Sequence, residues 1–205
     1  IEDNAECFLG EYKGKLVGTF GDAASFSFQS SKHLTSGEGG MLILKEEELA
    51  TKIRRVTSLG YAGVGASKAK ITKSDIQHPS YLRHVSMGWN YRMPELCCAV
   101  ALAQVERIDE LVGYRISSAN LIAEVISNFT WLVPQYCPDH IKNSYWTYVV
   151  KNDSTLSWDD LHKAVLSAGG DGLYGAWQLT YLEPMFKKMT LLGREKLISS
   201  SVLAN

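Results

Sequence analysis

Three chemically active groups stand near predicted strand ends in the first 32 residues: the carboxylate of Asp3, the hydroxyl of Ser27 and the amine of Lys32. Lys32 lies in SFSFQSSKHLTSGEGGM (25–41), between a short alternating strand and a run of small residues. The serines and glycines around it offer hydroxyls and bare backbone N–H groups, which suit an anionic ligand. The lysine could therefore anchor a phosphate or take part in chemistry itself.

These groups can converge, because ligands of open α/β sheets sit off the carboxyl ends of the strands. Residues 1–3 read as the end of one strand, and the alternation in 24–28 places Ser25 and Ser27 on one face of another. Pyridoxal phosphate needs an amine for a Schiff base, an acid beside its pyridine nitrogen and donors for its phosphate. Spacing alone does not prove such a site: Lys32 could be a surface lysine, Asp3 a turn cap and Ser27 an ordinary strand serine.

The elements that must position these residues alternate between strands and helices, which indicates an α/β fold. Residues 39–45 predict a buried strand, 46–60 an amphipathic helix and 60–90 a long ordered loop. Pro94 suits the first position of a helix that runs to residue 112, and a second helix is expected at about 114–128. A strand in SYWTYVVK (144–151) and a helix from 157 or 158 to 168 follow.

Composition excludes several classes of function. Lys and Arg number 21 against 22 acids, with no basic run, so nucleic acid is not an expected partner. The longest apolar run, 96–103, is too short for a membrane span, and no secretion signal opens the sequence. The four cysteines form no C-x-x-C and the five histidines are scattered, so we expect reduced thiols, a cytoplasmic location, no metal site and a small-molecule partner.

Three sequence blocks resemble successive signature motifs of the DegT/StrS family of sugar aminotransferases. They are IEDNAECF (1–8), GDAASFSFQSSKHLTSGEGG (21–40) and GWNYRMPELCCAVALAQVERIDELV (88–112). The resemblance implies the aspartate-aminotransferase (PLP type I) fold, with a large domain built on a mixed or parallel sheet and a small α/β domain after it. It also implies a homodimer that binds pyridoxal 5'-phosphate and moves an amino group from Glu or Gln to a keto-sugar, usually nucleotide-linked, in amino-sugar or cell-surface polysaccharide biosynthesis.

Position by position, the resemblance gives each site residue a role. Lys32 matches the Schiff-base lysine, Asp3 the partner of the pyridine nitrogen and Ser27 a phosphate ligand. Asn90 matches the asparagine that reaches the phosphate of the neighbouring subunit, although it could be an ordinary loop asparagine. Glu6 stands where the family has Gln beside the ring oxygen, so this carboxylate must be protonated, turned away or differently employed.

By the same resemblance, residues 1–112 are the C-terminal part of the large domain and 113–205 an incomplete small domain. Residues 189–205 end without the family's usual closing strand and helix, and the N-terminal segment with the ring-stacking residue is not present. Two alternatives to an active aminotransferase stay open. One is a non-catalytic fragment that does not hold cofactor by itself; the other is a related sugar dehydratase, which Lys32 disfavours because that branch has histidine there.

Overall fold

The computed structural model describes residues 1–68 and 71–188. The chain divides into two compact units, Ile1–Asp153 and Ser154–Asn205. The sequence boundary expected at 112/113 falls inside a helix, and the start of the small domain stays a prediction. Residues 189–205, where we expected no closing strand and helix, lie outside the described part of the chain.

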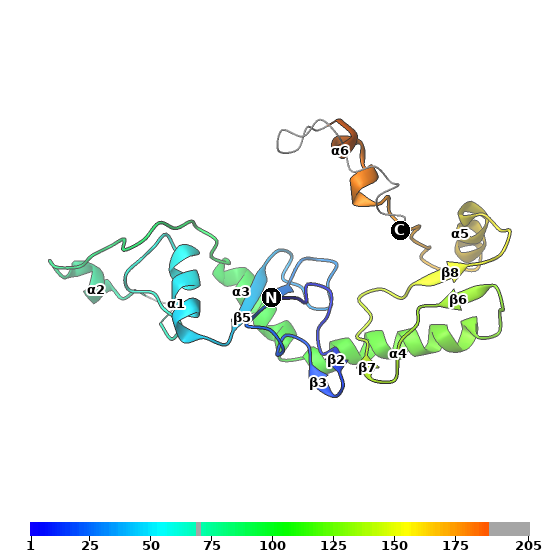
Figure 1. Cartoon of the computed structure of the whole chain (residues 1–205), viewed down its shortest axis with the longest axis horizontal. Helices are drawn as coiled ribbons and strands as arrows, with labels where there is room; N and C mark the ends of the chain where they lie inside the picture. Colours follow the sequence, from blue (N-terminus) through cyan, green and yellow to red (C-terminus); the bar gives the residue numbers. More distant parts are fainter. Residues whose placement is uncertain (69–70, 189–205) are drawn as a thin grey trace. The chain divides into compact units, whose positions relative to one another are not determined.

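A mixed three-stranded sheet occupies the middle of the first unit (Figure 1). Its strands, in spatial order, are β1 (Glu2–Asp3), β4 (Ala23–Ser27) and β5 (Gly40–Leu44). Strands β1 and β4 run parallel, with Asp3 opposite Ser25, whereas β4 and β5 are antiparallel. Because β1 and β4 are parallel, their carboxyl ends lie at the same edge of the sheet.

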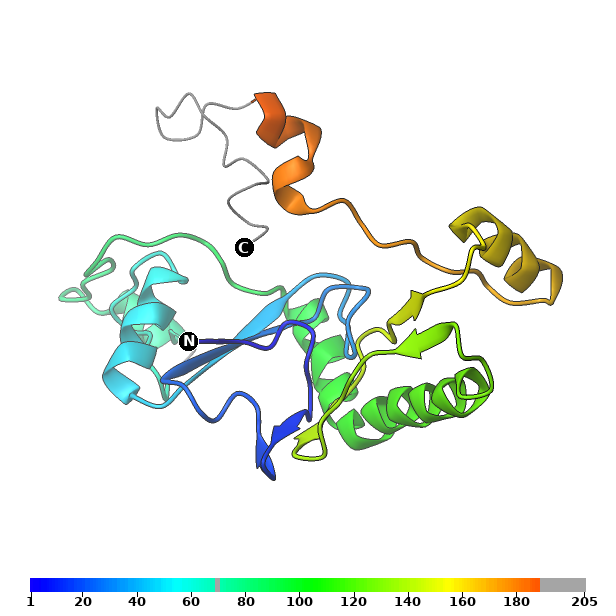
Figure 2. The same ribbon diagram turned by 45° about the vertical axis from the view of Figure 1, so that its right-hand side comes forward.

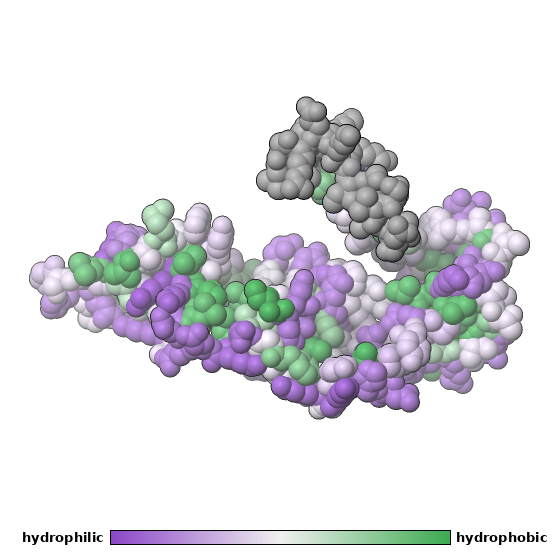
Figure 3. All heavy atoms as spheres, viewed as in Figure 1, coloured by the Kyte–Doolittle hydropathy of each residue, from purple (hydrophilic) through white to green (hydrophobic). Residues whose placement is uncertain are grey.

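Strand β5 was predicted to be buried, and this prediction is wrong for the described chain. Met41, Leu42 and Ile43 are each about half exposed, at 48%, 49% and 47%. The strand lies at the border of its sheet, and no other described strand pairs with its outer side. The space-filling view shows apolar surface in this region, near α1 and β5 (Figure 3).

Helix α1 (Glu47–Val56) follows β5 and is charged as the helix dipole favours, with acids in its first turn and Arg54 and Arg55 in its last. The segment after it is the long loop that the sequence predicted, with one short helix, α2 (Lys73–Gln77). Thr72 and Asp75 form a capping box at the start of α2, and bonds from Thr72 lower the pKa of the Asp75 carboxyl to about 2.

Two helices cover the next part of the chain, but their junction differs from the predicted one. Helix α3 runs over Glu95–Val105 and α4 over Ile108–Ile126, so the break lies at 106–107 rather than at 113. No proline or glycine marks this break in the sequence. Arg107 donates to both carboxylate oxygens of Glu110, at 3.0 and 2.8 Å, and so forms a bidentate ion pair at the start of α4.

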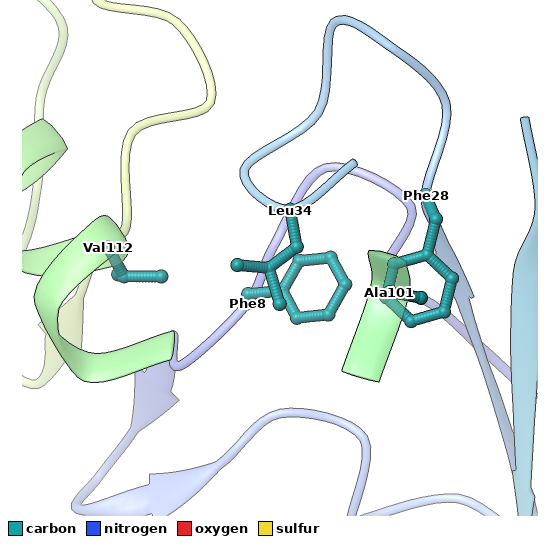
Figure 4. Packing of buried hydrophobic residues seen from close by; sticks show 5 residues of the cluster. All are labelled: Phe8, Phe28, Leu34, Ala101 and Val112. Carbon is teal, nitrogen blue, oxygen red and sulfur yellow. The ribbon is translucent and has the colours of Figure 1, made fainter. Parts of the chain in front are cut away.

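The buried core joins the sheet edge to both of these helices. Figure 4 shows its five members, Phe8, Phe28, Leu34, Ala101 and Val112. Phe28 follows β4 directly, and Leu34, fully buried, comes two residues after Lys32. The segment that carries Lys32 is therefore held from both sides by core residues.

Short strands complete the first unit, and the turned ribbon of Figure 2 shows some of them beside α4. One sheet has the order β3 (Lys15–Leu16), β2 (Glu11–Tyr12) and β7 (Ile141–Lys142), and β6 (Leu132–Pro134) pairs with β8 (Val150–Asn152). The strand predicted for 144–151 is largely absent, because only its end enters β8. Tyr145 has a left-handed backbone, with φ of 50°, which interrupts an extended chain there.

The second unit contains α5 (Trp158–Ser167), the 3-10 helix η1 (Thr180–Leu182) and α6 (Pro184–Lys188). Helix α5 matches its predicted bounds: Ser157 and Asp160 form a capping box at its start, and Gly169, with φ of 86°, follows its end. Of the helices described, none combines the length and the apolar character that crossing a membrane requires.

Candidate active site

Asp3 and Ser27 occupy the same edge of the sheet, at the carboxyl ends of β1 and β4. Asp3 Oδ1 accepts hydrogen bonds from Ser25 Oγ at 3.2 Å and from the Ala5 N–H at 3.1 Å. Ser27 Oγ accepts from the Gln29 N–H at 3.2 Å, which still leaves its own hydroxyl proton to donate. The edge thus presents a carboxylate and a hydroxyl, as the sequence predicted.

Glu2 fixes the strand that carries Asp3. Its carboxylate accepts three backbone N–H groups, from Gly18 at 2.6 Å, Phe20 at 2.8 Å and Gly21 at 2.6 Å. These bonds, the one from Gly21 first, lower the pKa of the Glu2 carboxyl, because they favour its charged form. Asp3 therefore projects from a strand end that is tied to the following loop.

Lys32 and Glu6 are brought together although 26 residues separate them. Lys32 Nζ lies 2.7 Å from Glu6 Oε1, which is the geometry of a charge-assisted hydrogen bond. The lysine side chain is only 14% exposed, whereas that of Glu6 is 52% exposed. The Glu6 carboxylate thus faces the candidate catalytic amine.

Trp146 completes the surroundings of Lys32, and the sequence reading did not include it. Lys32 Nζ lies 4.4 Å from the centroid of the Trp146 ring, within the range of a cation–π contact. The indole N–H donates to the Ser31 carbonyl at 2.8 Å. Trp146 is 114 positions away from Lys32 in a segment read as an ordinary strand, so no local signal linked the two.

Arg115 and His33 anchor the backbone around these two side chains. Arg115 donates to the Trp146 carbonyl at 2.9 Å and to the Lys32 carbonyl at 3.2 Å, and burial lowers the pKa of its guanidinium. His33 Nε2 lies 2.9 Å from the Ser144 carbonyl and must donate to it. Burial lowers the pKa of His33, so its ring is held neutral.

Asn90 lies in a different environment. The backbone of 89–91 is bonded to the end of α1: Ser58 and Asn90 form a bridge, and the Tyr91 N–H donates to the Thr57 carbonyl at 2.9 Å. Gly88 permits this approach, because a Cβ there would lie 2.4 Å from the Gly60 nitrogen. Asn90 is exposed, and within the described ranges no hydrogen bond joins it to the other four predicted site residues.

The comparison with protein families shows to which family the chain belongs. The model of the DegT/DnrJ/EryC1/StrS aminotransferase family matches residues 1–203, nearly the whole chain. The chain belongs to this family. The resemblance seen in the sequence blocks is therefore confirmed.

Two curated relatives of the DegT/DnrJ/EryC1/StrS family show how much of such a protein the chain represents. A GDP-perosamine synthase of Escherichia coli O157:H7 is 34% identical over 146 residues, which are 71% of this chain and 35% of that protein. A putative L-glutamine:3-amino-2,3-dideoxy-scyllo-inosose aminotransferase of Micromonospora echinospora is 31% identical over 82% of this chain and 38% of its own length. The chain thus spans well under half the length of these relatives.

Solved structures show the same fold. A DegT DnrJ EryC1 StrS aminotransferase from Brucella abortus superposes with a TM-score of 0.71 at 20% identity, over 91% of this chain and 45% of that one. The E. coli GDP-4-keto-6-deoxy-D-mannose-3-dehydratase with bound hydrated PLP gives a TM-score of 0.65 at 22% identity, over 82% and 44%. The predicted α/β fold with a mixed sheet, as in the DegT/DnrJ aminotransferases, is confirmed.

Proposed function

We propose that this chain is the catalytic-lysine part of a pyridoxal phosphate-dependent sugar aminotransferase. The observation that carries the proposal is the placement of Lys32: a largely buried amine, beside a sheet edge that presents the Asp3 carboxylate and the Ser27 hydroxyl. These are the amine, acid and hydroxyl that pyridoxal phosphate needs, so the residues present fit this cofactor.

Each residue has a role that follows from its chemistry. Lys32 would hold the cofactor covalently and, once freed by the amino donor, would move a proton to and from the reacting carbon. Asp3 would hold the proton of the pyridine nitrogen, and Ser27 would donate to the phosphate. Glu6 lies beside the lysine amine and bonds it. When bound, the cofactor supplies an electron sink for the reacting carbon.

The substrate side of the proposal takes support from the names of the relatives. They name a GDP-linked sugar product and L-glutamine as amino donor. For this chain we propose a keto-sugar substrate, nucleotide-linked, with glutamine or glutamate as amino donor. A spore coat polysaccharide biosynthesis protein of Bacillus subtilis, 33% identical over 75% of this chain and 38% of its own length, supports a role in polysaccharide synthesis. We place the reaction in the cytoplasm and in a homodimer, in which Asn90 reaches the cofactor phosphate of the other subunit.

Covalent attachment of the cofactor tests the proposal. The chain is incubated with pyridoxal phosphate, reduced with borohydride and digested, and the labelled peptide is identified by mass spectrometry. We expect the label on Lys32, with a visible absorbance band before reduction and no label in Lys32→Ala. The fold should survive that substitution, because the amine is not part of the core cluster.

The outcome also separates the enzyme from its alternatives. Protein absorbance alone, with no label on Lys32 in a folded chain, would show that this chain does not hold cofactor by itself. Label on Lys32 with loss of a sugar hydroxyl, and no amino transfer, would favour the dehydratase reading.

A further inference from the structure

We infer that Trp146 is a positioning residue for Lys32: the face of its indole ring, together with the Glu6 carboxylate, holds the lysine amine in place. The inference deepens the proposed function and rests on it for its catalytic meaning. The contact itself, however, belongs to the chain without cofactor and can be measured there.

Two different contacts meet at Lys32 Nζ. The ring centroid of Trp146 is 4.4 Å away, inside the roughly 6 Å over which a cation is attracted to an aromatic face. The Glu6 oxygen is 2.7 Å away. Since the lysine side chain is only 14% exposed, water screens these contacts less than it would on an open surface.

The residue before Trp146 has an unfavourable backbone conformation, which neighbouring hydrogen bonds hold in place. Tyr145 adopts a φ of 50°, which costs free energy for a residue with a side chain. Its neighbours compensate: the Tyr145 N–H donates to Asn143 Oδ1 at 2.9 Å, and the Ser144 carbonyl accepts from His33. Trp146 is tied at its indole N–H and at its carbonyl, to Ser31 and Arg115.

Among the charged and titratable groups near Lys32, Arg115 and His33 do not bond its amine, so the Trp146 ring is the contact beside that of Glu6. Arg115 directs its guanidinium at two backbone carbonyls, and His33 is neutral because burial lowers its pKa. Glu6 is the carboxylate that bonds the amine, and its own side chain is half exposed. Trp146, fixed at both ends, therefore supplies the rigid side of the amine's surroundings.

Two substitutions at Trp146 distinguish the effect of the aromatic face from the effect of the indole hydrogen bond. Trp146→Gln removes the aromatic face but keeps a donor for the Ser31 carbonyl, whereas Trp146→Phe keeps a face and removes the donor. The folded chain, without cofactor, is treated with limiting acetic anhydride, and acetylation of Lys32 is followed by mass spectrometry. Lys142, half exposed and paired with Glu11 at 2.8 Å, is the internal reference. Trp131→Gln is the control, a tryptophan of the same unit whose ring contact is with Phe129.

We expect Lys32 to be acetylated about threefold to tenfold faster in the Trp146→Gln chain than in wild type. In the Trp146→Phe chain, the acetylation rate of Lys32 should stay within about twofold of the wild-type rate. Trp131→Gln should leave the Lys32 rate unchanged. Equal rates in wild type and a folded Trp146→Gln chain would overturn the inference, as would a Phe variant as reactive as the Gln variant. Should Trp146→Gln fail to fold, Trp146→Met, which fills space without an aromatic face, carries the same expectation.

A separate measurement, labelling with pyridoxal phosphate, tests the proposed function. After pyridoxal phosphate and borohydride, label on Lys32 supports the enzyme, and slower or less complete labelling of Trp146→Gln than of Trp146→Phe supports positioning. A wild-type chain that takes no label contradicts the proposed function for this chain, while the acetylation rates still decide the contact between Trp146 and Lys32.

Discussion

The two parts of the candidate site differ in how they are held. Around Lys32, side chains distant in sequence are joined by hydrogen bonds and an ion pair, and Leu34 beside it is fully buried. Around Asn90, backbone bonds fix the segment, but its side chains face outward: Trp89 is 54% exposed and Tyr91 69%. The surroundings of Lys32 are therefore fixed by side-chain contacts within this chain, whereas the side chains around Asn90 are exposed.

The helix that follows Asn90 also exposes large side chains. Helix α3 buries Ala101 in the core, yet Leu96, Val100 and Leu102 are 83%, 51% and 60% exposed. Apolar side chains exposed to this extent along one helix are typical of a surface that another chain covers. The contrast supports a site in which Lys32 and Asp3 act in one subunit and Asn90 in the other.

The largest expected effect comes from mixing two inactive chains. If Asn90 serves the partner's site, Asn90→Ala and Lys32→Ala chains should form heterodimers with one intact site, and equal mixtures should regain about a quarter of the wild-type activity. Aminotransferase activity is measured before and after subunit exchange. Exchange demonstrated without any gain in activity would mean that Asn90 does not act across an interface.

A smaller effect is expected from substitution of Glu6, which pairs with Lys32. Glu6→Gln restores the residue usual in the family, and its amide oxygen can still accept from Lys32, so we expect kcat/KM to stay within about tenfold of wild type. Steady-state kinetics and cofactor affinity check this. A loss of more than about a hundredfold, or ~2.7 kcal/mol of transition-state stabilisation, would show that the carboxylate itself is required.

The smallest effect concerns His33, which ties the Trp146 segment to Lys32. Its pKa in the folded chain lies below the ordinary 6.5, because the ring is buried, so the unfolded chain binds more protons as the pH falls below that value. Stability should be fully present above pH 6.5 and decline below it. Denaturant unfolding from pH 7 to 5 measures this.

The matched variant for this pH dependence is His33→Gln, whose amide can donate to the Ser144 carbonyl but does not titrate. It should flatten the decline, while His78→Gln, at an exposed histidine, should retain it. A decline of equal slope in the His33→Gln chain would assign the pH dependence to other groups.

Local patterns in the sequence were enough to predict much of the fold. The alternation in 24–28 and the acids at the start of α1 are signals within a few residues of the elements they specify. The junction at 106–107 carries no such signal. Strand β5 was expected to be buried because its residues are apolar, but burial depends on what covers them, which a local pattern does not contain.

Likewise, only some residues of the candidate site could be predicted from local sequence patterns. Asp3, Ser27 and Lys32 could be named because they lie in two short sequence blocks, 1–8 and 21–40, and the parallel strands bring the first two to one edge. The sequence left three options open for Glu6, and the folded chain adds a contact that the sequence did not predict, the ion pair between Glu6 and Lys32. Trp146 and Arg115 could not be found, because their contacts with residues 31–32 span more than eighty positions.

The left-handed backbone at Tyr145 determines which substitutions this position can accept. Glycine or asparagine enters that conformation readily, whereas valine or isoleucine favours extended chain. A β-branched residue at position 145 would strain the left-handed backbone that interrupts 144–151. We therefore expect the handedness of the backbone to limit substitution at position 145, although the described structure shows no hydrogen bond between Tyr145 and Lys32.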